Sequence, residues 1–123
     1  MKLDDFKVLH NKFQSYLEGG KALADGERDQ YMDAMYDDNA CYEWAIVQDF
    51  NSTGFNYKRF CCIRMAEKIF AGLKENGKAD LDNKDVVMRL STDNTFGIPI
   101  HDGGNAVVPI TFCPWCGVAL NSQ

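Results

Sequence analysis

The sequence Cys113-Pro114-Trp115-Cys116-Gly117 is the stretch around which the second half of the chain is organised. Two thiols three positions apart can bind one metal ion. Gly117 can adopt the positive φ that turns the chain back around such an ion, and Pro114 fixes φ at the first corner of the turn. The spacing therefore predicts a zinc knuckle.

A structural zinc site needs four protein ligands, and the knuckle supplies two of them. Cys61 and Cys62 are the favoured second pair, because they begin a predicted helix whose N-terminus stabilises thiolates. If one of these two points into the core instead, His101 can complete the site, and Cys41 and His10 are the remaining candidates. The predicted zinc ligands are Cys61, Cys62, Cys113 and Cys116.

The gap between Cys62 and Cys113 holds 50 residues, which excludes a plain zinc ribbon with its shorter spacing. Zinc would instead pin a helix to a β-hairpin. A Cys-x-x-Cys can also be a redox pair at the start of a helix, but Gly117 suits a metal knuckle better than a helix start. We therefore expect a metal site.

Apolar periodicity predicts helices in the first part of the chain, over residues 3–18 and from about residue 27. Residues 41–50 fit either a helix or a strand, and we favour a helix. Residues 51–54 are predicted to form a loop, and residues 59–73 a further helix with the adjacent cysteines at its start.

β-Structure is expected after residue 85. Residues 86–90 are rich in β-formers, and residues 96–112 have the pattern of a hairpin around Asp102-Gly103-Gly104-Asn105. The expected fold is α+β, with N-terminal helices followed by a helix and a small antiparallel hairpin or sheet stapled by the zinc knuckle. We expect one domain over residues 1–123, made of an acidic helical region (1–57) and a cysteine module (58–123).

Charge is unevenly distributed along this chain of net charge −5. Residues 25–49 carry eight acids and one base, whereas residues 58–74 carry five bases and one acid. The acidic total disfavours binding to nucleic acid, because affinity for phosphates comes mainly from Lys and Arg. For the acidic segment we favour a solvated face, and the functional alternative is a surface that meets a basic protein partner.

We expect the protein to be cytoplasmic. No apolar run approaches the roughly 20 residues of a membrane-spanning helix, and the N-terminal residues lack the apolar core of a signal peptide. Five cysteines in such a chain are expected to be reduced or metal-bound rather than disulfide-bonded.

Three motifs together resemble a small family of uncharacterised bacterial and phage proteins. These motifs are Phe60-Cys61-Cys62, the turn from Gly97 to Gly104, and Phe112-Cys113-Pro114-Trp115-Cys116-Gly117. The resemblance covers roughly residues 58–120 and implies that both cysteine pairs and the turn belong to one module. It implies no activity.

These features favour a small acidic zinc-binding protein of non-enzymatic type. It would be an interaction module or inhibitor, phage-encoded and directed at a host nucleic-acid-binding protein. One alternative is a zinc hydrolase in which three cysteines leave a position open for water and His101 and Asp102 act as acid and base. The other is nucleic-acid binding through the basic helix, residues 58–74. We assign no catalytic residue.

Overall fold

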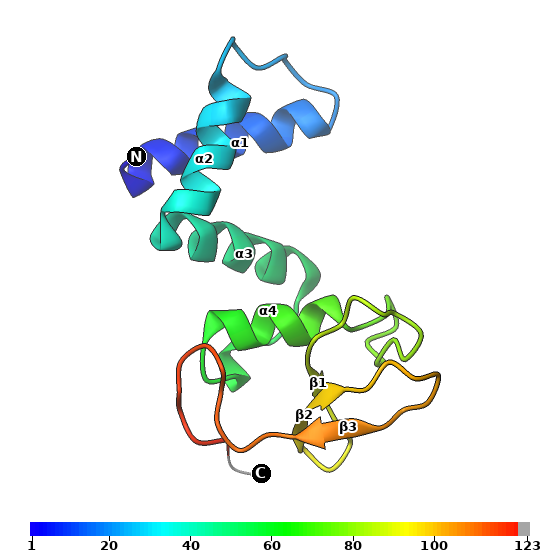
Figure 1. The fold of residues 1–123 in the computed structure, drawn as a ribbon. Coiled ribbons are helices and arrows are strands. Elements are labelled where there is room, and N and C mark those ends of the chain that lie inside the picture. Colours follow the sequence, from blue (N-terminus) through cyan, green and yellow to red (C-terminus); the bar gives the residue numbers. More distant parts are fainter. Residues whose placement is uncertain (121–123) are drawn as a thin grey trace. The chain divides into compact units, whose positions relative to one another are not determined.

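The computed structural model describes residues 1–120, in which four α-helices are followed by a small three-stranded antiparallel sheet (Figure 1). The predicted α+β class is therefore confirmed. The chain divides into two compact units, Met1–Thr53 and Gly54–Gln123, which we describe separately. No helix within the described residues combines the length and the apolar character needed to cross a membrane.

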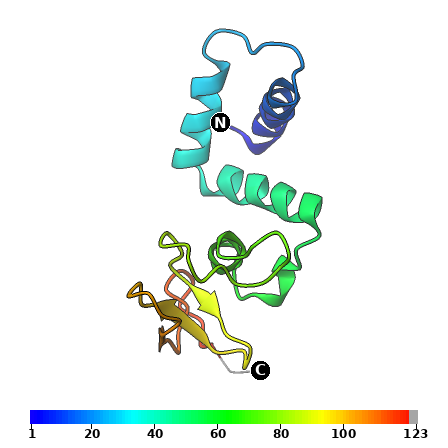
Figure 2. The same cartoon turned by 90° about the vertical axis from the view of Figure 1, so that its right-hand side faces the viewer.

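The first unit consists of α1 (Leu3–Leu17), α2 (Glu27–Asp37) and α3 (Asn39–Thr53), and each of these helices contacts the other two (Figure 2). The apolar stripe predicted on residues 3–18 is the reason that α1 packs on both neighbours. The core of the first unit consists of Phe6, Leu9, Tyr31, Ala34, Cys41 and Ala45.

Asp38 separates α2 from α3 and settles how residues 41–50 fold. Its backbone is extended, and its carboxylate accepts hydrogen bonds from the N–H groups of Ala40 and Cys41. A capping Asp satisfies amides that have no helical partner, so α3 begins at the next residue, Asn39. The loop predicted at residues 51–54 is wrong in most of its length, because α3 continues to Thr53 and only Gly54 leaves the helix, at φ +77°.

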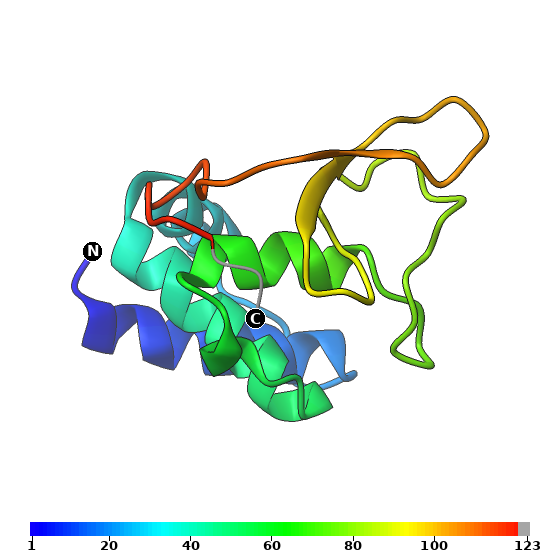
Figure 3. The ribbon, with the colours of Figure 1, turned by 90° about the horizontal axis from the view of Figure 1, so that it is seen from below.

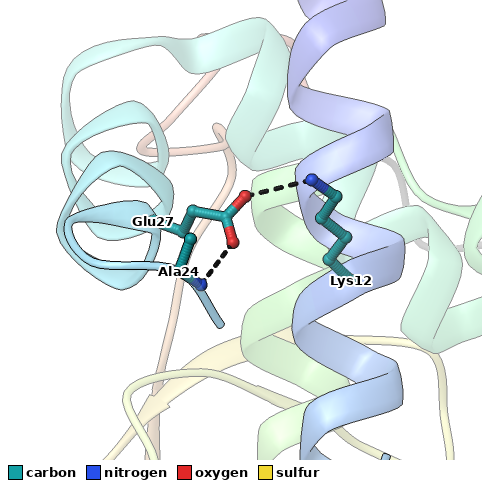
Figure 4. Close-up of polar contacts among 3 residues, drawn as sticks. All are labelled: Lys12, Ala24 and Glu27. Carbon is teal, nitrogen blue, oxygen red and sulfur yellow. Dashed lines mark hydrogen bonds and ion pairs between the residues drawn. The ribbon is translucent and has the colours of Figure 1, made fainter. Parts of the chain in front are cut away.

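Glu27 fixes the connection between α1 and α2 (Figure 4). One carboxylate oxygen accepts the Ala24 N–H at 2.7 Å, and the other lies 3.1 Å from Lys12 Nζ on α1. These two bonds lower the pKa of the Glu27 carboxyl group. The Glu27 side chain thus holds the end of the connection that leads into α2 and ties α2 to α1.

The second unit contains a 3₁₀ turn, η1 (Tyr57–Arg59), the helix α4 (Ile63–Ala71), and the strands β1 (Arg89–Leu90), β2 (Phe96–Pro99) and β3 (Val107–Pro109). The strands are antiparallel in the order β1-β2-β3, and Ile98 lies opposite Val108. The predicted hairpin is present. The helix and the first strand are shorter than predicted, because Cys62 has an extended backbone and pairing of β1 with β2 begins only at Arg89.

The core of the second unit joins α4 to the C-terminal turn. Met65 and Ile69 from α4 pack with Met88 and Cys113, and all four side chains are buried. Figures 1 and 3 both place the C-terminal loop beside the first turn of α4. This packing brings the two cysteine pairs together.

Candidate metal centre

Four cysteine sulfurs meet at the start of α4. The Sγ atoms of Cys61, Cys62, Cys113 and Cys116 all lie within 4.8 Å of one another. Cys62 Sγ is 3.8 Å from Cys113 Sγ, and Cys116 Sγ is 3.5 Å from Cys61 Sγ. A tetrahedral zinc with Zn–S bonds of about 2.3 Å places its sulfurs about 3.8 Å apart. The four cysteines are therefore close enough to hold one metal ion.

The first pair is positioned by the N-terminus of α4. Cys62 is the N-cap residue of this helix, and its sulfur accepts the N–H of Met65 at 3.4 Å. A sulfur at this position takes the place of the usual Ser or Asp oxygen. The helix start thereby fixes where the sulfur of Cys62 lies and gives it a hydrogen-bond donor.

The second pair is positioned by a tight turn. The Gly117 N–H donates to the Cys113 carbonyl at 2.9 Å, with Gly117 at φ +75°, and the Trp115 N–H donates to Cys113 Sγ at 3.4 Å. The Cys113 N–H donates to Val118 O at 2.9 Å and closes the base of the turn. Gly117 thus has the role that the sequence predicted for it.

The electrostatics of the site differ between its sulfurs. Burial opposes ionisation of Cys113, but hydrogen bonds from the N–H groups of Cys116 and Trp115 outweigh it and lower the pKa of Cys113 to about 7. Burial raises the pKa of Cys61 and of Cys62, with further increases from the neighbouring thiols. Four thiols without a cation cannot all ionise together, because like charges repel.

The site has a buried side and an exposed side. Cys113 is 2% exposed and Cys62 is half-buried, whereas Cys61 and Cys116 are exposed. An ion held here would be reached by solvent only from the side of the outer pair. Such burial is typical of a site that joins structural elements.

The other candidate ligands lie elsewhere. His101 Nε2 is 2.9 Å from the Val86 carbonyl oxygen, Cys41 is buried in the core of the first unit, and His10 Nδ1 is 2.9 Å from the Tyr31 hydroxyl. The four-cysteine group among the described residues includes neither histidine. The sequence did not reveal the backbone donors of Met65 and Trp115, because their positions depend on the turn geometry.

Residues 59–123 match the family described as "Domain of unknown function (DUF6980)". No curated protein and no solved structure matches the chain. The matched segment contains both cysteine pairs, the sheet and α4. This agrees with the resemblance to an uncharacterised family over the second half of the sequence. The match covers more than half of the chain, so the chain belongs to the DUF6980 family.

Proposed function

We propose that this protein is a non-enzymatic zinc protein, in which the ion stabilises the second unit and an acidic surface of the first unit binds a basic partner. The observation that carries the zinc assignment is the convergence of four cysteine sulfurs within 4.8 Å. Four thiolates complete a tetrahedral site and leave no position for a reacting water, as in structural rather than catalytic zinc sites. This chemistry disfavours the hydrolase alternative.

Metal analysis of the purified protein tests the zinc assignment. We expect one zinc per chain, and we expect Co²⁺ substitution to give the intense absorption of a tetrahedral four-thiolate site. Tetrahedral thiolate sites also suit iron, which would colour the protein. Iron in the purified protein would contradict the assignment of zinc. Absence of stoichiometric metal after purification under reducing conditions would contradict the proposal.

The partner surface is argued from α2. Asp29, Asp33 and Asp37 recur every four residues, so they form one exposed stripe, the acidic ridge. Within residues 1–120, no ion pair involves these three carboxylates. The adjacent Met32 and Tyr36 are 39% and 82% exposed. Exposed aromatic and apolar side chains beside unpaired charge are typical of protein-binding surfaces.

A depression in the same surface supports a basic partner. Its volume is about 350 Å³, and its lining includes Asp33, Asp37 and Asp38. A lysine or arginine side chain of a partner would find carboxylate acceptors there. We therefore propose a partner with a basic surface, such as a nucleic-acid-binding protein, whose binding face this chain would cover. For a phage-encoded inhibitor, this would be a host protein.

Affinity capture with matched variants tests the partner surface. We expect Asp29→Asn/Asp33→Asn/Asp37→Asn to lose the basic proteins that the wild-type chain retains. The control Asp4→Asn/Asp5→Asn/Glu18→Gln removes the same charge from exposed positions on or just after α1 and should retain them. Identical retained proteins for wild type and ridge variant, in low and in high salt, would refute the ridge as the interface.

A further inference from the structure

The second unit contains a cavity of about 600 Å³ between α4, β1 and the loops that follow them. Among the described residues, its lining includes three cationic residues, Arg59, Lys78 and Arg89, and no Asp or Glu. The chain as a whole carries 18 acids and 13 Lys or Arg. The positive charge of this lining is therefore opposite in sign to the net charge of the chain. A cavity of this size is in the range of small-molecule sites.

Arg89 is the unusual member of this lining. It is only 6% exposed, and it makes no ion pair with any carboxylate in the described part of the chain. Its Nη2 donates to the carbonyl oxygens of Asp80 and Leu81, at 3.3 and 3.2 Å, while its Nε has no hydrogen-bond partner among residues 1–120. A buried cation without a counter-ion is costly, and an anion in the cavity would offset that cost.

Arg59 is held in place at the cavity. Its Nη2 donates to Asn94 Oδ1 at 3.4 Å, and its guanidinium lies 5.3 Å from the centre of the Phe60 ring. Lys78, on the loop after α4, is exposed. Arg59 and Lys78 are exposed to solvent, whereas Arg89 is already buried. An entering anion can therefore contact the two exposed side chains first.

Much of the remaining wall is apolar and partly aromatic, and Ser91, Thr92 and Asn94 are its polar members. Phe55 and Phe60 are stacked with ring centres 5.7 Å apart, and Ile69, Leu73 and Met88 also line the cavity. We propose that this cavity binds a small aromatic anion, with its carboxylate or phosphate group near Arg59, Lys78 and Arg89 and its ring against the apolar wall. None of the described residues lining this cavity is a cysteine of the metal centre or a carboxylate of the acidic ridge.

Titration of the metal-loaded full chain with phenyl phosphate, followed by amide NMR shifts, tests the proposal. Saturable shifts are expected at residues 72–94. Inorganic phosphate lacks the ring and benzyl alcohol lacks the charge, so both should bind at least about fivefold more weakly. Benzoate in place of phenyl phosphate distinguishes a carboxylate site from a phosphate site.

Charge variants assign the contacts. Arg59→Gln/Lys78→Gln removes the two more accessible cations, and we expect about tenfold weaker binding of phenyl phosphate with unchanged binding of benzyl alcohol. The control Lys2→Gln/Lys84→Gln removes the same charge from exposed positions outside the cavity. Arg89→Met should abolish phenyl phosphate binding, and the double variant carries the test if that variant fails to fold.

Three results would overturn the proposal. These are no saturable shift with phenyl phosphate or benzoate, equally strong binding of benzylamine, or equal losses in the double variant and its control.

Discussion

Cys62 Sγ lies 3.8 Å from Cys113 Sγ, although 51 positions separate the two residues in the sequence. One of these residues caps α4 and the other begins the C-terminal turn. A metal bound between them would close a long loop and remove much of the freedom of the unfolded chain. A bound metal would add substantially to the stability of a unit of this size, because a small hydrophobic core alone gives little stability.

Metal removal should therefore loosen the second unit selectively. After chelation, we expect hydrogen exchange to accelerate at residues 62–73 and 111–120, because both segments lose the ion that joins them. Residues 3–53 form a separate compact unit with its own core and provide the internal control. Unchanged protection of residues 111–120 in the metal-free protein would show that the thiols alone hold the turn.

Replacing single cysteines should identify the ligand set. Structural zinc sites contribute about 10–16 kcal/mol, so one of four thiolates accounts for roughly 3 kcal/mol, or about 100-fold in affinity. We expect losses of this size in competition titrations for Cys→Ser at positions 61, 62, 113 and 116. Cys41→Ala and His101→Gln should bind zinc like the wild type. A comparable loss in His101→Gln would place that histidine among the ligands.

The sequence predicted much of this arrangement because the relevant signals are local. The thiol spacing and Gly117 predict the turn, and the Asp-Gly-Gly cluster predicts the hairpin; both are present. The end of α3 was missed because the polar residues before Gly54 continue a helix as readily as they form a loop. The cavity around Arg89 left no signal, because burial of a single arginine depends on how segments distant in the sequence pack.

The affinity for zinc should depend steeply on pH. The pKa values of Cys61 and Cys62 are raised, so in the metal-free protein both thiols keep their protons at neutral pH. Zinc must displace at least these two protons, and affinity should fall about 100-fold for each unit by which pH decreases near neutrality. Competition titrations at pH 6.5, 7.0 and 7.5 measure this slope. A slope of one proton or less would show that at least one of these two thiols is already ionised in the metal-free protein.

Gly117→Ala should weaken the site through the backbone alone. An added Cβ would meet no atom of residues 1–120 within 4 Å, but φ is +75°, which costs a residue with a side chain about 1–2 kcal/mol. We expect zinc affinity to fall about 5- to 30-fold. Gly117→Asn should lose less, because Asn tolerates this conformation better. Gly104→Ala, where φ is not positive, is the control, and an equal loss there would contradict the argument.

His10 should make the stability of the first unit sensitive to acid. Burial lowers the pKa of this histidine, against the opposing effect of the Asp49 carboxylate. Its Nδ1 lies 2.9 Å from the Tyr31 hydroxyl, and its ring packs edge-on against Trp44. The neutral ring is therefore the form that fits the folded unit.

The sign of the effect follows from the two states. In the unfolded chain His10 has a pKa of about 6.5, so below that pH the unfolded state binds more protons than the folded state. The contribution of His10 is fully present above pH 6.5 and decreases as pH falls from there through the lower folded-state pKa. Trp44 fluorescence in a Trp115→Phe background reports denaturant unfolding of the first unit. The free energy of unfolding should decline between pH 7 and 5.5, and adding His10→Asn should flatten this decline. An equal decline in both proteins would assign the acid sensitivity to other groups.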